Sequence, residues 1–373
     1  MTEFRHGHSG ASSWDEAVTE CVAALRPLPE GANLGFVYAT DAFAQNLPAI
    51  VGQLKRATNV GDWVGTVGIG VCASGREYFD GPGLAVMVGA FPEGSFHVVP
   101  TIKSEIGQFH ADSRSWIAQA EPQLGIIHAD PRNERVPGLI GDLAATSRSF
   151  LVGGLTSSRG QYWQVAGDGA AEGGISGVLI AGAVPVATAL SQGCSPVGPK
   201  RTITGCQDNI ITHLDGETAL DVLKQDIGPE LARDLRHIGG IIFAALPVPG
   251  TDTGDYLVRN LVGIDPARGW LAIAAEVSEG DRLMFCRRAR DTAVEDLKRM
   301  LAQLKRRTGD AAPKGAVYIS CLARGPNTFG PDSAELAILR EALGDLPLVG
   351  FYANGEISHG RLYGYTGVLT LFL

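Results

Sequence analysis

The sequence predicts a mixed α/β protein of two domains, in which mixed sheets pack against helices and are built from a repeated β-α-β-β unit. The chain has 373 residues, more than a single hydrophobic core usually spans. Apolar residues make up 45% of it and charged residues 19%, which is typical of a well-buried globular protein. Apolar segments rich in glycine also recur three times in the same order, which indicates an internal repeat.

Each copy of the repeat has a strand, a helix, a second strand that contains a Val-Gly pair, and a last strand. The predicted elements are 34–39, 47–57, 63–70 and 83–91 in the first copy, 124–129, 139–146, 150–160 and 175–184 in the second, and 315–321, 332–343, 348–356 and 366–373 in the third. The pairs are Val64-Gly65, Val152-Gly153 and Val349-Gly350. Their similar place in each copy predicts one architecture used three times.

An amphipathic helix is expected before each copy, and capping chemistry supports two of these helices. Ser13 and Glu16 form a capping-box pattern ahead of the first copy. Asp291 opens a helix before the third copy, and this helix ends in the basic residues Lys305, Arg306 and Arg307, as the macrodipole favours. Between the second and third copies we expect strands at 186–193, 209–214, 241–246 and 270–277 and one helix near 217–225, so strands outnumber helices there.

Composition argues against several classes of partner and cofactor. The net charge of −9 disfavours a nucleic-acid partner, and no apolar run is long enough to span a membrane. The N-terminus lacks the pattern of a secretory signal, and the six cysteines form no C-x-x-C pair, so we expect reduced thiols and a cytoplasmic location.

No cofactor or required metal is predicted. Gly65, Gly68 and Gly70 are spaced in the wrong order for a dinucleotide fingerprint, and no Gly-Lys-Ser/Thr sequence occurs. His6 and His8 would lie on one face of a strand, but a solvated pair explains them better than metal ligation.

Two cysteines are candidate nucleophiles. Cys194 follows a glycine, and Cys321 ends a strand three residues before Arg324, which can supply charge but cannot act as a base. Cys321 alternates with Val317 and Ile319, so a buried apolar role explains it at least as well.

Polar residues follow the first strand of each copy, and the third copy has the most distinctive set. Arg324 and Asn327 follow its first strand, and Asn354-Gly355, a turn signal, precedes a lone carboxylate, Glu356. Strand ends beside glycine turns form concave sites for small ligands. Arg324 suits a ligand carboxylate and Glu356 an amine, although an internal ion pair or two solvated charges explain them equally well.

Several of these stretches resemble the FIST (F-box and intracellular signal transduction) family. The stretches at 256–265, 279–291, 319–325 and 346–357 resemble the FIST C-terminal domain, and those at 64–70, 152–158 and 186–220 resemble the FIST N-terminal domain and its junction. The resemblance implies domains at 1–207 and 208–373. The sequence departs from the family pattern at Asn354 and at Leu322-Ala323.

The resemblance implies a sensory protein that binds a small ligand, with amino acids as one class, and acts through a signalling partner. The candidate ligand-binding residues are Arg324, Glu356, Asn354, Tyr352, Cys321, Asn327, Cys194 and Asn209. Two other functions stay open: an enzyme with Cys321 or Cys194 as nucleophile, and a non-catalytic adaptor that binds another protein through a flat face.

Overall fold

A computed structural model describes residues 3–248 and 256–373, and the chain divides into two compact units. The first unit contains Met1–Ser191 and Leu297–Leu373, and the second contains Gln192–Asp296. The second unit is therefore an insertion in the sequence of the first. The predicted boundary at 207/208 lies inside this insertion. The predicted mixed α/β class with mixed sheets is confirmed.

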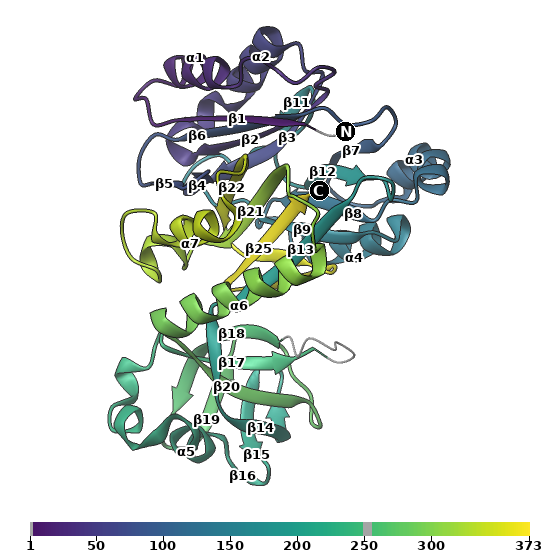
Figure 1. The fold of residues 1–373 in the computed structure, drawn as a ribbon. Helices are drawn as coiled ribbons and strands as arrows, with labels where there is room; N and C mark the ends of the chain where they lie inside the picture. The colour runs from purple at the N-terminus through teal and green to yellow at the C-terminus, as the bar shows by residue number, and fades with distance from the viewer. Residues whose placement is uncertain (1–2, 249–255) are drawn as a thin grey trace. The chain divides into compact units, whose positions relative to one another are not determined.

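The first unit consists of three modules, shown mainly in purple, blue and yellow-green in Figure 1, and each predicted copy of the repeat lies in one of them. Module one contains β1 (Phe4–Ser9), α1 (Trp14–Ala24), β2 (Leu34–Thr40), η1 (Asp41–Asn46), α2 (Leu47–Thr58), β3 (Asp62–Gly68), β4 (Gly70–Ala73), β5 (Arg76–Phe79) and β6 (Leu84–Gly89). Module two contains β7 (Phe96–Ile102), α3 (Gly107–Ala120), β8 (Leu124–Ala129), α4 (Val136–Ser147), β9 (Phe150–Leu155), β10 (Gln164–Gly167), β11 (Gly169–Ala171) and β12 (Ile175–Ile180). Module three contains β13 (Val186–Gln192), α6 (Arg290–Thr308), β21 (Gly315–Cys321), η3 (Gly325–Asn327), α7 (Ala334–Leu343), β22 (Leu348–Ala353), β23 (Glu356–Ser358), β24 (Arg361–Tyr363) and β25 (Thr366–Phe372).

The glycines of the three Val-Gly pairs occupy the same position in each module. In the parallel pairs β2–β3, β8–β9 and β21–β22, they lie opposite Val37, Ile127 and Tyr318. A Cβ atom at Gly65, Gly153 or Gly350 would lie 1.7, 1.8 or 1.6 Å from the carbonyl oxygen of that opposite residue. The repeated glycine is therefore required because the two backbones approach too closely for any side chain.

The modules exchange hairpins in a cycle. The hairpin β4–β5 of module one pairs with β22 of module three, β10–β11 of module two pairs with β3 of module one, and β23–β24 of module three pairs with β9 of module two. In the described part of the chain, each module thereby contributes four strands to its own six-stranded sheet and two strands to another. This exchange interlocks all three modules.

The inner faces of the three sheets meet in a common apolar core, and the helices cover the outer faces. The inner core combines residues of every module, including Phe36, Ile126 and Phe351. The outer face of module one packs on α1 and α2, and that of module two packs on α3 and α4. The three sheets therefore enclose one interior.

Two local interpretations of the sequence differ from the structure. Ser13 lies at the N-cap of α1, but its side chain makes no capping hydrogen bond, so the predicted capping box does not form. Asn354-Gly355 does not close a hairpin. The chain instead leaves β22 there and enters β23, which belongs to another sheet, and Gly355 has a φ of 127°, which favours glycine.

The second unit is a strand-rich unit that closes on itself. Its elements are β14 (Cys194–Gln207), β15 (Ile210–Leu214), β16 (Glu217–Thr218), α5 (Ala219–Ala232), η2 (Leu235–His237), β17 (Ile242–Pro247), β18 (Tyr256–Asp265), β19 (Trp270–Ile273) and β20 (Arg282–Arg288). Its sheet has the order β14-β20-β17-β18-β19-β15-β16, and a further pairing of β14 with β15 closes the ring. Apolar side chains of α5 and of these strands form its separate core. The predicted excess of strands in this region is confirmed.

Candidate functional site

One end of the inner core is polar, and it lies where the first strand of each module ends. Thr40, Asp130 and Cys321 occupy equivalent positions at the ends of β2, β8 and β21, and all three are buried. Neighbouring contacts cross the module boundaries. Thr66 and Thr156 share a hydrogen bond of 2.6 Å, and the Ser157 hydroxyl donates to the Tyr352 carbonyl at 2.5 Å.

Module three places a buried ion pair at this end. Arg324 follows β21 and is only 1% exposed, and its Nε atom donates to Oε1 of Glu335 at 2.8 Å. Glu335 lies in the first turn of α7 and also accepts hydrogen bonds from the Tyr318 hydroxyl at 2.6 Å, the Ser320 hydroxyl at 3.1 Å and the Gly325 amide at 2.8 Å. A fully buried carboxylate is stabilised by such a set of donors.

The guanidinium of Arg324 is incompletely satisfied. Its Nη2 atom lies 3.4 Å from both the Ser191 and the Tyr318 hydroxyl oxygens, and its plane lies over the Phe329 ring at 4.9 Å. Burial alone would lower the pKa of Arg324, but Glu335 and Tyr318 outweigh this and raise it. The Nη1 atom is buried and has no hydrogen-bond partner among the described residues.

Glu356 is the second charged residue of the cluster and is fully buried. Its Oε2 atom accepts hydrogen bonds from the amide and the hydroxyl of Thr366, at 3.0 and 2.7 Å. Its Oε1 atom is buried, and no described residue donates to it. Burial raises the pKa of this carboxyl to about 8, although Thr366, Arg324 and the neighbouring Cys321 thiol act in the opposite direction.

The position of Glu356 differs chemically between modules. The same register position of the exchanged hairpin is Val71 in module one and Gln164 in module two, opposite Phe351 and Thr66. Gln164 is fully buried and donates to the Thr156 hydroxyl at 2.9 Å. Module three therefore has the ionisable version of a position that is neutral in the other two.

The polar residues after the first strands of modules one and two are engaged in ion pairs of their own. Asp41 pairs with Arg159 at 3.2 Å, and Asp130 pairs with Arg132 at 2.6 Å. The Asp130 carboxylate also accepts the Gly173 amide at 2.8 Å, and Arg132 lies over the Tyr162 ring. These two arginines are about half exposed, in contrast to Arg324.

The structure brings together some of the predicted site residues and separates others. Tyr352 is buried in β22, and Cys321 lies beside Glu356 and Arg324. Asn354 and Asn327 are exposed, and Asn327 donates to the Leu322 carbonyl at 3.0 Å. Cys194 and Asn209 belong to the second unit, where Asn209 donates to the Ile273 carbonyl at 2.9 Å.

Glu335 and Tyr318 are members of the cluster that the sequence interpretation missed. In α7, Glu335 precedes Leu336 and lies four residues before Leu339, and both leucines are buried, so the helical periodicity places Glu335 toward the buried side. The macrodipole also favours an acid in the first turn of a helix that is exposed, so the sequence alone did not distinguish Glu335 as a buried site residue.

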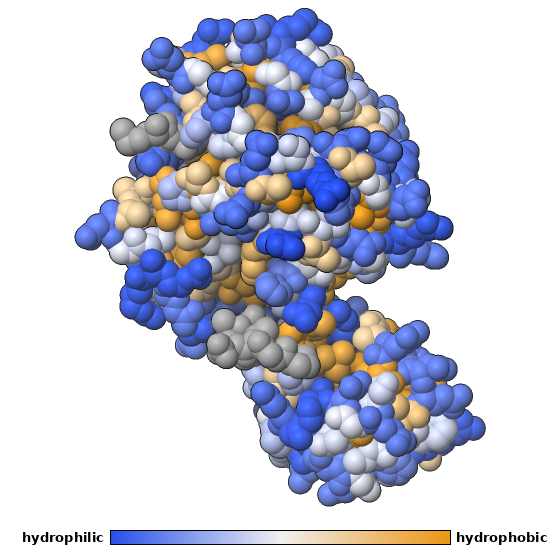
Figure 2. Space-filling model, turned by 90° about the vertical axis from the view of Figure 1, so that its right-hand side faces the viewer, coloured by the Kyte–Doolittle hydropathy of each residue, from blue (hydrophilic) through white to orange (hydrophobic). Residues whose placement is uncertain are grey.

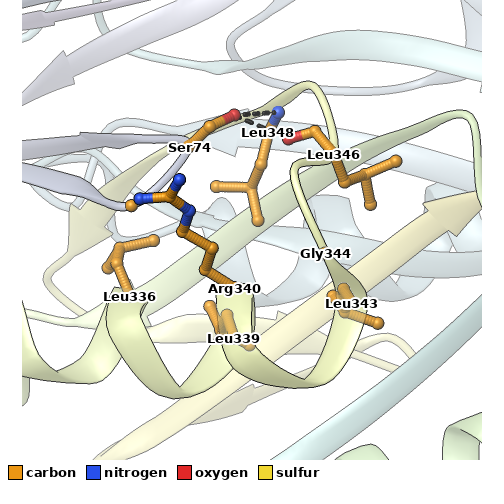
Figure 3. Close-up of a pocket in the computed structure, with 9 residues that line it drawn as sticks. Ser74, Leu336, Leu339, Arg340, Leu343, Gly344, Leu346 and Leu348 are labelled. Carbon is orange, nitrogen blue, oxygen red and sulfur yellow. Dashed lines mark hydrogen bonds between the residues drawn. The ribbon is translucent and has the colours of Figure 1, made fainter.

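A small hollow beside α7 does not coincide with the cluster. It is a depression open to solvent, and its volume of about 240 Å³ includes the space at its mouth. Its lining consists of Ser74, Gly75, Leu336, Leu339, Arg340, Leu343, Gly344, Leu346 and Leu348. Figure 3 shows leucines of α7 on one side and Ser74 on the other, with Arg340 across the mouth. Its apolar lining offers little to a charged ligand.

Two other kinds of site are absent from the described part of the chain. Residues 3–248 and 256–373 contain no group of three or more His, Cys, Asp or Glu side chains placed to hold a metal ion. Within the same residues, no helix has the length and apolar character needed to cross a membrane.

Similarity to solved structures is weak. A cyanuric acid hydrolase from A. caulinodans aligns over 100% of this chain and 99% of its own at 9% identity, with a TM-score of 0.36. T. maritima PurL complexed with FGAR aligns over 99% of this chain and 72% of its own at 12% identity, with a TM-score of 0.25.

Sequence similarity is more informative. The chain is 29% identical over 359 residues to the uncharacterized protein Rv0628c of Mycobacterium tuberculosis strain H37Rv, covering 91% of this chain and 90% of that protein. It is 32% identical over 212 residues to the uncharacterized protein Mb0898c of Mycobacterium bovis, covering 54% and 53% of the two chains. Family models for the FIST N domain and the FIST C domain match residues 33–217 and 219–359. The chain therefore belongs to the FIST family, whose domains are associated with sensing in signal transduction.

Proposed function

We propose that this protein is a cytoplasmic sensor that binds a small zwitterionic metabolite, such as an α-amino acid, and acts through a signalling partner. The ligand would bind in the polar cluster of module three. The observation that carries this proposal is a pair of buried, unpartnered atoms of opposite character: Nη1 of Arg324, a donor, and Oε1 of Glu356, an acceptor once its carboxyl is ionised. The two groups are close enough for Arg324 to influence the Glu356 carboxyl.

An α-amino acid supplies the partner that each atom lacks. Its carboxylate would accept from Nη1 of Arg324, while its ammonium would donate to Oε1 of Glu356. Leaving a buried polar atom unpaired costs about 1–3 kcal/mol, so a ligand that pairs both atoms recovers this energy. Micromolar binding corresponds to roughly −8 kcal/mol, which two charge-assisted hydrogen bonds and some apolar burial can supply.

The alternative functions receive less support from the surroundings of their candidate residues. Burial and the Glu356 carboxyl both raise the pKa of the Cys321 thiol, which disfavours a nucleophilic thiolate. Among the described residues, Val262 is the one large hydrophobic side chain that is exposed. Figure 2 shows hydrophobic residues in small groups among hydrophilic ones on the visible face of the first unit and a larger group on the second unit, so a flat apolar docking face is not favoured on this face of the first unit.

A thermal-shift screen of the standard amino acids at millimolar concentration tests the proposal. We expect at least one amino acid to raise the melting temperature of the wild-type protein. The same ligand should bind at least about tenfold more weakly to Arg324→Lys and Glu356→Gln, because each loses one charge-assisted contact of about 1.4 kcal/mol or more.

Arg340→Lys is the matched control, because Arg340 is an exposed arginine of α7 that pairs with Asp345 outside the cluster. This variant should bind like the wild-type protein. The proposal fails if no amino acid shifts the melting temperature, or if both cluster variants, shown to be folded by circular dichroism, keep wild-type affinity.

A further inference from the structure

The exchanged hairpin β4–β5 holds α7 at both ends. On one side of the hairpin turn, the Ser74 hydroxyl donates to the Leu346 carbonyl at 2.6 Å and accepts the Leu348 amide at 3.0 Å, just beyond the C-terminus of α7 (Figure 3). On the other side, the Glu77 amide donates to the Ser333 hydroxyl at 2.8 Å, at the N-cap of the same helix. A segment of module one therefore spans a helix of module three.

The carboxyl of Glu77 lies in an unusual environment at the first turn of α7. It faces the Tyr352 hydroxyl on β22, the Leu336 amide, and the carboxylate of Glu335 on α7 itself. The Cys72 thiol on β4 is the other titratable group that faces it. Both Glu77 oxygens and the fully buried Tyr352 hydroxyl lack hydrogen-bond partners among the described residues. The contact brings two acids together without a cation of its own, because Arg324 already pairs with Glu335.

The interface between the hairpin and α7 includes a shallow hollow. This hollow lies between the turn at Ser74-Gly75 and the leucines of α7, of which Leu336 and Leu339 are buried. The hydrogen bonds of Ser74 and of the Glu77 amide attach the hairpin near the two ends of the helix. A change at Glu77 therefore acts on one of the two attachments.

We propose that the hairpin β4–β5 and α7 form a proton-operated latch, in which a neutral Glu77 carboxyl keeps the hairpin closed on the first turn of α7 and its ionisation opens this contact. The same turn carries Glu335, the partner of Arg324. Opening the latch thus transmits a change of pH to the buried ion pair. This mechanism requires no ligand, so it stands or falls separately from the proposed function.

The direction of the effect follows from the charges around Glu77. Burial, with a smaller contribution from Glu335, raises its pKa from 4.5 to about 7. The Tyr352 hydroxyl and the Leu336 amide face the carboxyl without completing a hydrogen bond to it, and they offset only part of this rise. A carboxyl that is more acidic in the open state favours opening as the pH rises. If the open state has an ordinary carboxyl pKa, the opening equilibrium increases by up to about tenfold between pH 6 and pH 8.

Hydrogen exchange of the ligand-free, full-length protein, corrected for the intrinsic pH dependence of exchange, measures this opening. In the wild-type protein we expect the amides of the first turns of α7 to lose up to about tenfold in protection between pH 6 and pH 8. In Glu77→Gln, which is permanently neutral, protection should stay at the level of pH 6. Equal pH dependence in both proteins, or none in the wild type, would overturn the proposal.

Two further variants keep the test decisive if Glu77→Gln folds poorly. Ser333→Ala removes the hydroxyl that accepts the Glu77 amide, so α7 should exchange faster than in the wild type at both pH values. Glu356→Gln removes the other buried acid with a raised pKa, on a different hairpin, and should leave the pH dependence of α7 in place. A pH dependence that disappears in Glu356→Gln would assign the effect to Glu356 and contradict the latch.

Discussion

The Nε atom of Arg324 lies 2.8 Å from Oε1 of Glu335, so the arginine predicted to meet a ligand carboxylate already holds a carboxylate of its own chain. This pair joins the loop after β21 to the first turn of α7. Since both side chains are almost fully buried, neither charge is stabilised by water. The internal ion pair that the sequence left open does exist, but its acid is Glu335 and not Glu356.

Removing one partner of this ion pair should destabilise the folded protein. We expect Glu335→Ala to lower the free energy of unfolding by about 3–5 kcal/mol, because it leaves Arg324 charged and unpaired in the interior. The double variant Arg324→Met, Glu335→Leu should recover most of this loss. Asp345→Ala is the control, since it removes the exposed partner of Arg340 and should cost less than about 1 kcal/mol. Urea unfolding measures all three, and a loss below about 1 kcal/mol in Glu335→Ala would contradict the assignment.

The three interstrand glycines provide a test of the repeated architecture. Alanine at Gly65, Gly153 or Gly350 would place its Cβ within 1.8 Å of a backbone carbonyl oxygen. Because the parallel strands must separate to admit this atom, each substitution should lower the free energy of unfolding by more than about 3 kcal/mol. Gly141 in α4 serves as the comparison, because a Cβ atom added there would have no neighbouring atom within 4 Å. Gly141→Ala should stabilise the protein by about 0.4–1 kcal/mol, as judged by thermal unfolding.

The sequence predicted the repeat because its evidence is local. The Val-Gly pairs, the apolar strands and the helix of each copy are all visible within one segment, and they follow from strand and helix periodicity. The exchange of hairpins was not predictable in this way. β23 has only three residues, and its partner β9 belongs to another module, about 200 positions away in the chain. A turn signal such as Asn354-Gly355 cannot show whether the next strand returns to the same sheet.

The candidate site was predicted only in part, because only some of its residues have a recognisable local sequence pattern. Arg324, Glu356 and Cys321 lie near glycines and strand ends, where a local pattern points to a site. Glu335 lies in a helix whose first turn favours an acid whether or not it is buried, so only its tertiary contacts distinguish it. The second unit was recognisable as strand-rich, but its closed ring depends on the long-range pairing of β14 with β20 as well as on the local hairpin of β14 with β15.

The buried carboxyl of Glu356 should make stability depend on pH in a predictable direction. Its pKa is raised from 4.5 to about 8 in the folded protein, so the folded state binds the proton more tightly than the unfolded state. The protonated Glu356 carboxyl therefore adds to the free energy of unfolding at low pH. This stabilisation is lost as the pH rises from about 5 to about 8, by on the order of 2–4 kcal/mol. Glu356→Gln should show a flatter profile over that range in chemical unfolding. An unchanged slope in this variant would mean that the carboxyl is ionised in the folded state at neutral pH.

Thiol labelling distinguishes a reactive cysteine from a structural one. Of the six cysteines, Cys206 is partly exposed and the other five are buried. Burial and the Glu356 carboxyl raise the pKa of Cys321, and burial raises that of Cys206, so neither thiol has the anionic character of an activated nucleophile. Iodoacetamide at about pH 6 should therefore label the native protein slowly at every position, and at higher pH Cys206 should react first because it is the most accessible. Rapid labelling of Cys321 alone at about pH 6 would instead support catalysis, since only a stabilised thiolate reacts quickly under those conditions.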